Sequence, residues 1–190
     1  DMIMAIVSNY LRKKGKLAKD TVVATVMSNL GLHKYARDNG LELVQTKVGD
    51  RYVLEEMLKD GYNLGGEQSG HVILLDYNPT GDGILTSLML IQAILEENET
   101  ASKMAEIIKL YPQVLINAKV NSDKKYDYDK DDEIKSAIEK LEKEFAGNGR
   151  VLIRPSGTEP LVRVMIEGED QEYITKKAKE IANLIEEKLK

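Results

Sequence analysis

The sequence predicts an α/β protein, with a mixed-sheet α/β domain followed by a smaller α+β domain, a sheet with two helices. The first half alternates short β-rich runs with amphipathic helices, an order typical of right-handed α/β units. The second half follows the order strand, helix, hairpin, helix. Pro112 and a change of pattern near residues 111–120 indicate a boundary, so we expect domains at residues 1–111 and 112–190.

In the first half we expect helices over residues 2–13 and 30–38, and a third that Asp50 caps and Gly61 ends. Predicted strands cover residues 21–26, 41–46 and 72–75. The first of these is rich in β-branched residues and is typical of a buried parallel strand.

A helix over residues 84–96 follows, with Asp82 as its N-cap. It is apolar almost all round, which predicts burial on every side. A further helix is expected over residues 100–110, before Pro112.

In the second half we expect a strand over residues 113–121 and then a charged, solvated loop over 122–132, to which we assign no function. An apolar stripe from Ile134 to Phe145 predicts a helix. The last helix follows Asp170, which is placed to cap it.

Composition excludes several classes of function. The 190 residues are 42% hydrophobic and 31% charged. We expect the apolar residues to form a buried core and the charged residues to keep the protein in solution. A net charge of -5, with one Phe and no Trp, argues against nucleic acid as the main partner. With no Cys and two His, a disulfide or a metal site built on these residues is not expected.

The ends and hydropathy of the chain predict a cytoplasmic fragment. No signal peptide is visible, and no run of about 18 apolar residues would cross a membrane. The chain begins with Asp1 and enters a helical pattern at once, which suggests a fragment of a longer protein.

Residues 154–160, Arg-Pro-Ser-Gly-Thr-Glu-Pro, lie between two predicted strands, at 150–153 and 161–167. A planar guanidinium, two hydroxyls and unhindered backbone amides are the groups that bind a phosphate dianion. Arg163, on the following strand, adds a second positive charge. A Pro-x-Gly segment between strands is also typical of a plain turn, and that alternative stays open here.

Residues 63–71 form a second polar loop, in which glycines surround Glu67, Gln68 and Ser69. A carboxylate accepts hydrogen bonds from two adjacent hydroxyls, so such a loop suits a sugar. The alternative is a tight hairpin with incidental polar residues. His71, at the end of the loop, is on its own more typical of a structural histidine.

Together, these two loops resemble the sugar-binding and phosphate-binding loops of the α-D-phosphohexomutases. Three further stretches, at residues 25–29, 48–52 and 80–83, resemble the bacterial amino-sugar branch of that family. The resemblance covers the whole chain. It corresponds to the third and fourth of four family domains, with the helix that leads into the third.

The resemblance implies an enzyme that interconverts hexose 6-phosphates and 1-phosphates, here those of glucosamine. A phosphoserine in the first domain and a magnesium loop in the second carry the chemistry, with glucosamine 1,6-bisphosphate as intermediate and activator. Neither catalytic element occurs in this sequence, so the fragment alone is expected to be inactive, with no catalytic or metal residue. The implied partners are a phosphosugar and the missing N-terminal domains; a homodimer of the full-length enzyme is left open, and a membrane partner is not expected.

The resemblance also implies roles for individual residues. The non-transferred phosphate is held by Arg154, Ser156, Gly157 and Thr158, with Arg163 as a further candidate. The sugar 3- and 4-hydroxyls are bound by Glu67 and Ser69, with Gln68 and His71 beside them. Where relatives that act on mannose or glucose phosphates carry histidine, this chain has Asp50, so Asp50 and Arg51 are candidates for amino-sugar specificity.

Three other functions compete with this one. The chain could belong to a family member that acts on glucose or mannose phosphate. It could be a phosphosugar-binding module that never had a catalytic half. A nucleic-acid-binding α+β domain is the third, and the net charge and scarcity of aromatic residues disfavour it.

Overall fold

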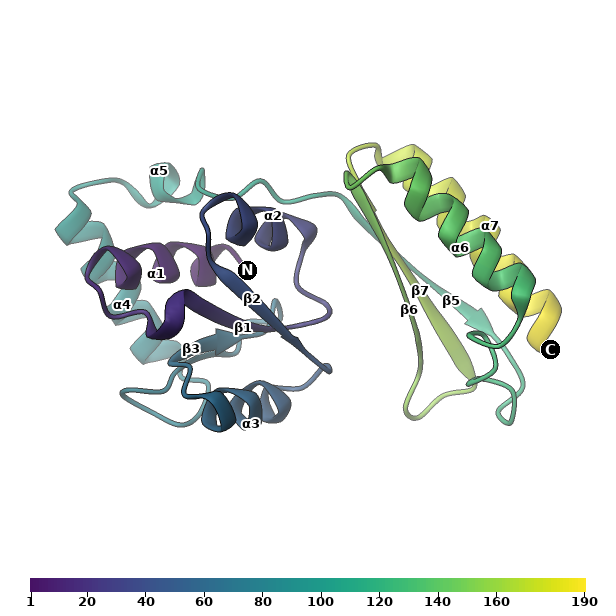
Figure 1. Ribbon diagram of the computed structural model, residues 1–190, viewed down its shortest axis with the longest axis horizontal. Helices are drawn as coiled ribbons and strands as arrows, with labels where there is room; N and C mark the ends of the chain where they lie inside the picture. Colours follow the sequence, from purple (N-terminus) through teal and green to yellow (C-terminus); the bar gives the residue numbers. More distant parts are fainter. The chain divides into compact units, whose positions relative to one another are not determined.

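In the computed structural model, which describes all 190 residues, the chain forms two compact units, Asp1–Leu110 and Tyr111–Lys190. Figure 1 shows a sheet with helices in each unit. Both the α/β class of the first unit and the α+β class of the second are confirmed. No helix has the length and apolar character needed to cross a membrane.

Unit 1 is organised around a four-stranded sheet with the strand order β2-β1-β3-β4. Its parallel strands are β1 (Thr21–Thr25), β2 (Glu42–Thr46) and β3 (Leu64–Gly66), and β4 (Val72–Leu74) runs antiparallel to β3. The predicted mixed sheet is therefore confirmed. Every residue of β1 is buried, because helices cover both faces of the sheet.

The helices of unit 1 lie on both sides of this sheet (Figure 1). The sheet and its helices share two apolar clusters: Val22 and Ala24 of β1 belong to the one with α1, α2 and α4, whereas Val23 belongs to the one with α3. The helices and the short 3-10 turn are α1 (Met2–Lys13), η1 (Ala18–Asp20), α2 (Leu30–Asp38), α3 (Asp50–Asp60), α4 (Gly83–Glu97) and α5 (Ala101–Ala105).

Capping residues set most of the helix starts. Asp82 caps α4 as predicted: its carboxylate accepts hydrogen bonds from the amides of Ile84 and Leu85, and these bonds lower the pKa of its carboxyl group. Asp50 was expected to cap α3, and this prediction is wrong. Gly49 occupies the cap position with φ +132°, and Asp50 is the first helical residue.

Two predictions about the end of unit 1 are also wrong. The helix expected over residues 100–110 is only Ala101–Ala105, since the chain leaves the helix and buries Ile108 in the unit 1 core. The expected burial of α4 on every side fails as well. Met89 and Ala93 are buried on one side, but the opposite side carries exposed leucines and isoleucines.

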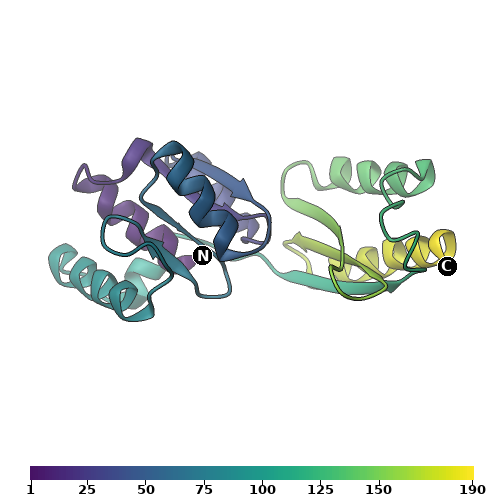
Figure 2. The ribbon, with the colours of Figure 1, turned by 90° about the horizontal axis from the view of Figure 1, so that it is seen from below.

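Unit 2 is a three-stranded antiparallel sheet, order β5-β7-β6, with two helices on one face (Figures 1 and 2). Val162, Val164 and Ile166 of β7 pack into the apolar cluster under these helices, so the alternate residues face the other way. The elements are β5 (Gln113–Lys119), α6 (Asp132–Phe145), β6 (Gly149–Pro155), β7 (Leu161–Gly168) and α7 (Gln171–Leu189).

Candidate functional site

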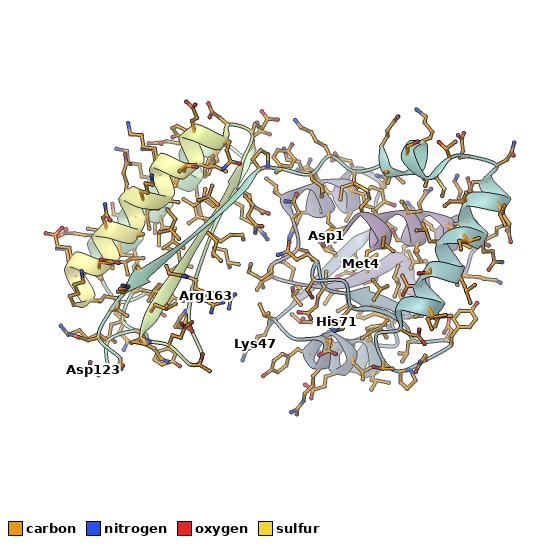
Figure 3. All side chains as sticks on the ribbon, turned by 180° about the vertical axis from the view of Figure 1, so that it is seen from behind. Asp1, Met4, Lys47, His71, Asp123 and Arg163 are labelled. Carbon is orange, nitrogen blue, oxygen red and sulfur yellow. The ribbon has the colours of Figure 1, made fainter.

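The first candidate loop is the turn of the β3–β4 hairpin, in unit 1 (His71 is labelled in Figure 3). The Glu67 amide donates to the His71 carbonyl at 2.8 Å, and the Gly70 amide donates to the Glu67 carbonyl at 3.1 Å. The loop is thus a tight hairpin turn, which is the geometry that the sequence leaves open as the alternative to a sugar-binding loop. Strand β3 was not predicted, because three residues that include two glycines carry no β pattern.

Two glycines allow other parts of unit 1 to approach β3 closely. A Cβ atom on Gly65 would lie 2.7 Å from Met57 Sδ of α3. On Gly66 it would lie 2.4 Å from the His71 carbonyl oxygen and 3.1 Å from Met4 Sδ of α1. The strand that leads into Glu67 is therefore held by tight packing.

The Glu67 carboxylate is oriented by a contact outside its own turn. Its side chain is 11% exposed, and Oε1 accepts a hydrogen bond from the Gly49 amide at 2.9 Å. Oε2 lies 3.7 Å from His71 Nδ1, which is 3.4 Å from Ser69 Oγ. Three of the predicted sugar-binding residues thus lie together, and Oε2 keeps the capacity to accept from a hydroxyl.

The remaining predicted residues of unit 1 are more exposed. Asp50 and Arg51 directly follow Gly49, whose amide binds the Glu67 carboxylate. The structure therefore brings the predicted specificity residues close to Glu67. The Arg51 guanidinium binds Glu55 at 2.7 Å on its own helix, and this hydrogen bond raises the pKa of Arg51. Gln68 lies exposed at the tip of the turn.

The second candidate loop is the turn of the β6–β7 hairpin, where two arginines face each other. Arg154 and Arg163 are cross-strand partners in the antiparallel register, on the sheet face away from α6 and α7 (Arg163 is labelled in Figure 3). The Nε atom of each is buried and has no hydrogen-bond partner. Burial lowers the pKa of Arg154, and the nearby Arg163 charge lowers it further.

Such an arrangement favours the binding of an anion. Like charges directly opposite on a sheet repel, and a buried charged donor without a partner is costly. Arg163 has one weak acidic partner, Glu159 Oε2, at 3.4 Å from Nη2. Two guanidiniums that share one face match the oxygens of a phosphate.

The turn itself is held by internal hydrogen bonds. Ser156 is 1% exposed; its amide donates to the Leu161 carbonyl at 2.9 Å, and its Oγ accepts from the Glu159 amide at 3.2 Å. Gly157 and Thr158, in contrast, are exposed. Of the predicted phosphate-binding residues of the turn, Ser156 supports the turn from inside, while Gly157 and Thr158 lie on its surface.

Sequence reasoning missed one residue at this turn. Lys125 Nζ donates to the Ser156 carbonyl oxygen at 2.9 Å. Lys125 lies in the charged segment to which we assigned no function, 31 positions away along the chain. No local pattern marks such a contact, because it depends on where β5 ends relative to the β6–β7 turn.

The chain does not supply a magnesium site of its own. No group of three or more Asp, Glu, His or Cys side chains is arranged to hold a metal ion. The family resemblance implies that magnesium binds in a domain outside this sequence, and no step below depends on an ion bound here.

Comparison with known proteins identifies the family. Residues 1–111 match the model for the phosphoglucomutase/phosphomannomutase alpha/beta/alpha domain III, and residues 115–184 match the model for the C-terminal domain of the same proteins. The chain belongs to the phosphoglucomutase/phosphomannomutase family. The resemblance inferred from the two loops is thereby confirmed.

Curated members of this family are similar over the whole chain. The phosphoglucosamine mutase of Ruminiclostridium cellulolyticum is 58% identical over 189 residues, which cover 100% of this chain and 42% of that protein. The phosphoglucosamine mutase of Clostridioides difficile is 57% identical with the same coverage. The chain thus spans less than half the length of the curated relatives that it matches.

Solved structures of the family share the fold. N-acetylphosphoglucosamine mutase of Aspergillus fumigatus aligns with a TM-score of 0.78 at 20% identity, covering 98% of this chain and 43% of that one. A phosphoglucomutase/phosphomannomutase family protein of Burkholderia thailandensis aligns with a TM-score of 0.67 at 18% identity, covering 97% and 40%. Another structure of the Aspergillus enzyme is a complex with GlcNAc-6P and magnesium.

Proposed function

We propose that this chain is the substrate-binding half of a phosphoglucosamine mutase, which interconverts glucosamine 6-phosphate and glucosamine 1-phosphate. The observation that carries the proposal is the pair of buried, unpartnered guanidinium Nε atoms on Arg154 and Arg163. It occurs in a family chain whose longer relatives, at 57–58% identity, bear that name.

In this proposal the β6–β7 turn holds the phosphate that is not being transferred. Arg154 and Arg163 bind its oxygens, and the backbone amides of the exposed residues Gly157 and Thr158 add donors. Ser156 and Lys125 keep the turn in shape. Positioning of this kind accounts for most of the catalytic effect that proteins have on phosphoryl transfer.

The β3–β4 turn is proposed to bind the sugar hydroxyls. Glu67, fixed by the Gly49 amide, accepts hydrogen bonds from the 3- and 4-hydroxyls, and Ser69 offers a further hydroxyl. Gln68 and His71 complete the contact from the same turn. These hydroxyls can be presented equivalently whether the phosphate is at carbon 1 or carbon 6, which a reversible mutase needs.

The chemical step is proposed to depend on residues outside this chain. A phosphoserine donates its phosphoryl group, glucosamine 1,6-bisphosphate is the intermediate, and magnesium binds outside the 190 residues. The chain alone is therefore expected to bind its ligand without turning it over, and weakly, because it supplies only part of the contacts.

The proposal is tested by an amide NMR titration of the chain with glucosamine 6-phosphate, inorganic phosphate and glucosamine. We expect the amides of Ser156, Gly157 and Thr158 to shift with both phosphates. We expect the amides of residues 67–69 to shift only with the two sugars. If the 156–158 amides do not move at tens of millimolar phosphate, in this chain or in a polypeptide of the relatives' length, the phosphate assignment is wrong.

A mutase for glucose or mannose phosphate is the second candidate, because the family model carries those names. Asp50, exposed beside the Gly49–Glu67 contact, is the residue proposed to favour an ammonium group. In a polypeptide of the relatives' length, Asp50→His should shift the ratio of kcat/KM values towards glucose phosphate. An unchanged ratio would remove Asp50 from the specificity argument.

A further inference from the structure

The β6–β7 turn places an acid inside the proposed phosphate site. Glu159 is the acidic residue of the stretch 154–163, and its Oε2 atom lies 3.4 Å from Arg163 Nη2. Its side chain is 56% exposed. A negative charge next to a site for an anion lowers the affinity of that site. The carboxylate of Glu159 is therefore unfavourable for phosphate binding, and its position needs another explanation.

The carboxylate is not needed to hold the turn. The Glu159 amide donates to Ser156 Oγ at 3.2 Å, and the Glu159 carbonyl accepts from the Leu161 amide at 2.9 Å. Both hydrogen bonds use backbone atoms of Glu159, so another residue at this position would also make them. They fix where the side chain begins, and this brings the carboxylate to the Arg163 guanidinium. The side chain therefore acts on Arg163 rather than on the fold of the turn.

The contact between Glu159 and Arg163 is weak enough for a phosphate to displace it. A distance of 3.4 Å is long for a charged hydrogen bond, and ion pairs between exposed groups contribute little to stability. A phosphate dianion, in contrast, can bond to the guanidiniums of Arg154 and Arg163 at once, since the two are cross-strand partners. Glu159 is thus a weaker ligand than phosphate for the same guanidinium.

We propose that Glu159 is an internal competitor for the phosphate site. Its carboxylate occupies the Arg163 guanidinium in the free protein, phosphate displaces it on binding, and its return speeds the release of phosphate. This inference rests on the proposed function and adds to it a residue that sets how long the phosphate stays. The turn of a mutase receives the phosphate of carbon 1 and that of carbon 6 in alternation, so it must release each of them. Binding both more tightly would lower KM without raising kcat.

The opposite role predicts an effect of the opposite sign. If Glu159 instead oriented Arg163 for phosphate, loss of its carboxylate would weaken phosphate binding. Three variants of the 190-residue chain separate the two roles. Glu159→Gln removes the charge, whereas Glu159→Asp keeps the charge but shortens the side chain by one methylene, so that it no longer reaches Arg163. Glu180→Gln is the matched control, because Glu180 on α7 is a similarly exposed acid, paired with Lys177 at 3.2 Å.

The dissociation constant for inorganic phosphate is measured from the amide shifts of Gly157 and Thr158. We expect Glu159→Gln to strengthen phosphate binding about three- to tenfold, which is the effect of removing one charge close to a bound anion. Glu159→Asp should strengthen it about twofold, because the contact with Arg163 is lost and the charge moves away. Glu180→Gln should leave it unchanged, since α7 covers the opposite face of the sheet.

Several outcomes would overturn the competitor role. Unchanged or weaker binding by Glu159→Gln would do so while leaving the phosphate site itself intact. An equal gain in Glu180→Gln would assign the effect to net charge, and an unchanged affinity in Glu159→Asp would show that the contact with Arg163 does not compete. If neither the unsubstituted chain nor a polypeptide of the relatives' length binds phosphate at residues 156–158, the proposed function and this inference fall together.

Enzyme kinetics test the effect on release in a polypeptide of the relatives' length. Glu159→Gln should lower the KM for glucosamine 6-phosphate about threefold or more and should also lower kcat, because the phosphate leaves more slowly. The Tm should stay within about 2 °C, since the backbone hydrogen bonds of Glu159 are kept. A higher KM, or a kcat that does not fall, would contradict the competitor role.

Discussion

The two candidate turns are both hairpin turns, yet they differ in how their polar groups are satisfied. In the β3–β4 turn, Glu67 accepts a hydrogen bond from the Gly49 amide and lies near His71. In the β6–β7 turn, Arg154 and Arg163 face each other with buried Nε atoms that have no partner. The first turn has its acidic group engaged by the protein itself, whereas the second presents two like charges that a bound anion would neutralise.

The two turns also differ in how closely other residues pack against their backbones. Gly65, which leads into the first turn, lies against Met57 and Val53 so closely that no side chain fits. Gly157, in the second turn, has open space around its Cα. Packing therefore fixes the first turn, whereas the second is fixed by hydrogen bonds that Ser156 accepts from the Glu159 amide and from Lys125.

The largest effect is expected from removing one guanidinium of the facing pair. Arg154→Met should weaken binding of inorganic phosphate about 10- to 100-fold, the loss of about 1.5–3 kcal/mol from a charged hydrogen bond. It should also raise the Tm in phosphate-free buffer, because the like-charge pair disappears. Calorimetry and thermal melts measure both, with the exposed Arg37→Met as the control. A lower Tm with unchanged phosphate affinity would mean that the pair is structural.

The packing contrast is tested by the same substitution at two glycines. Gly65→Ala should lower the free energy of unfolding by about 1–3 kcal/mol, because its Cβ would lie 2.8 Å from Val53 Cγ1. Gly157→Ala should change it by less than about 0.5 kcal/mol, since nothing lies within 4 Å. Urea unfolding compares the two variants, and equal losses would contradict the contrast.

Substitutions of Glu67 test whether sugar binding and phosphate binding depend on separate residues. Glu67→Ala should abolish the glucosamine-dependent amide shifts of residues 67–71 and lower stability by about 1 kcal/mol, because the Gly49 amide loses its acceptor. Glu67→Gln keeps an acceptor oxygen, so it should retain the stability. Both variants should leave the phosphate-dependent shifts at Ser156 and Thr158 intact. A loss of those shifts would mean that Glu67 has a role in phosphate binding as well.

The smallest effect is expected at Lys125. Lys125→Met removes one hydrogen bond to the Ser156 carbonyl and should weaken phosphate binding about fivefold, since such a bond contributes about 1 kcal/mol. Lys125→Arg should restore most of the affinity. The neighbouring Lys124, which contacts the Lys190 carbonyl instead, provides the matched control Lys124→Met. Equal losses in the two methionine variants would indicate a general charge effect.

Local sequence signals predicted the parts of the fold that local forces determine. Asp82 and Asp170 cap the helices that they were expected to cap, and the β6–β7 hairpin forms around the predicted turn. The cap of α3 was wrong because Gly49, with its positive φ, takes the position where Asp50 was expected. Which of two adjacent residues takes the cap position depends on backbone geometry that a sequence pattern does not contain.

Long-range contacts account for the other differences. Periodicity indicated correctly that α4 is apolar, but not that the rest of unit 1 leaves one side of this helix exposed. Both candidate turns were found from residue types alone. The Gly49–Glu67 and Lys125–Ser156 contacts were not, because each joins segments that only the folded chain brings together.

The two candidate turns also have a consequence for the order of folding. Each turn closes a hairpin between consecutive strands. The outermost residue pairs of the two hairpins are Leu64 with Leu74 and Gly149 with Gly168, so their contacts are close in sequence. The parallel pairing of β1 with β3 joins Val23 to Gly65 and must close a far longer loop. We expect pulse-labelled refolding to protect the amides of Glu67 and Ser156 before those of β1, so that the two candidate turns form before the sheet of unit 1 is complete.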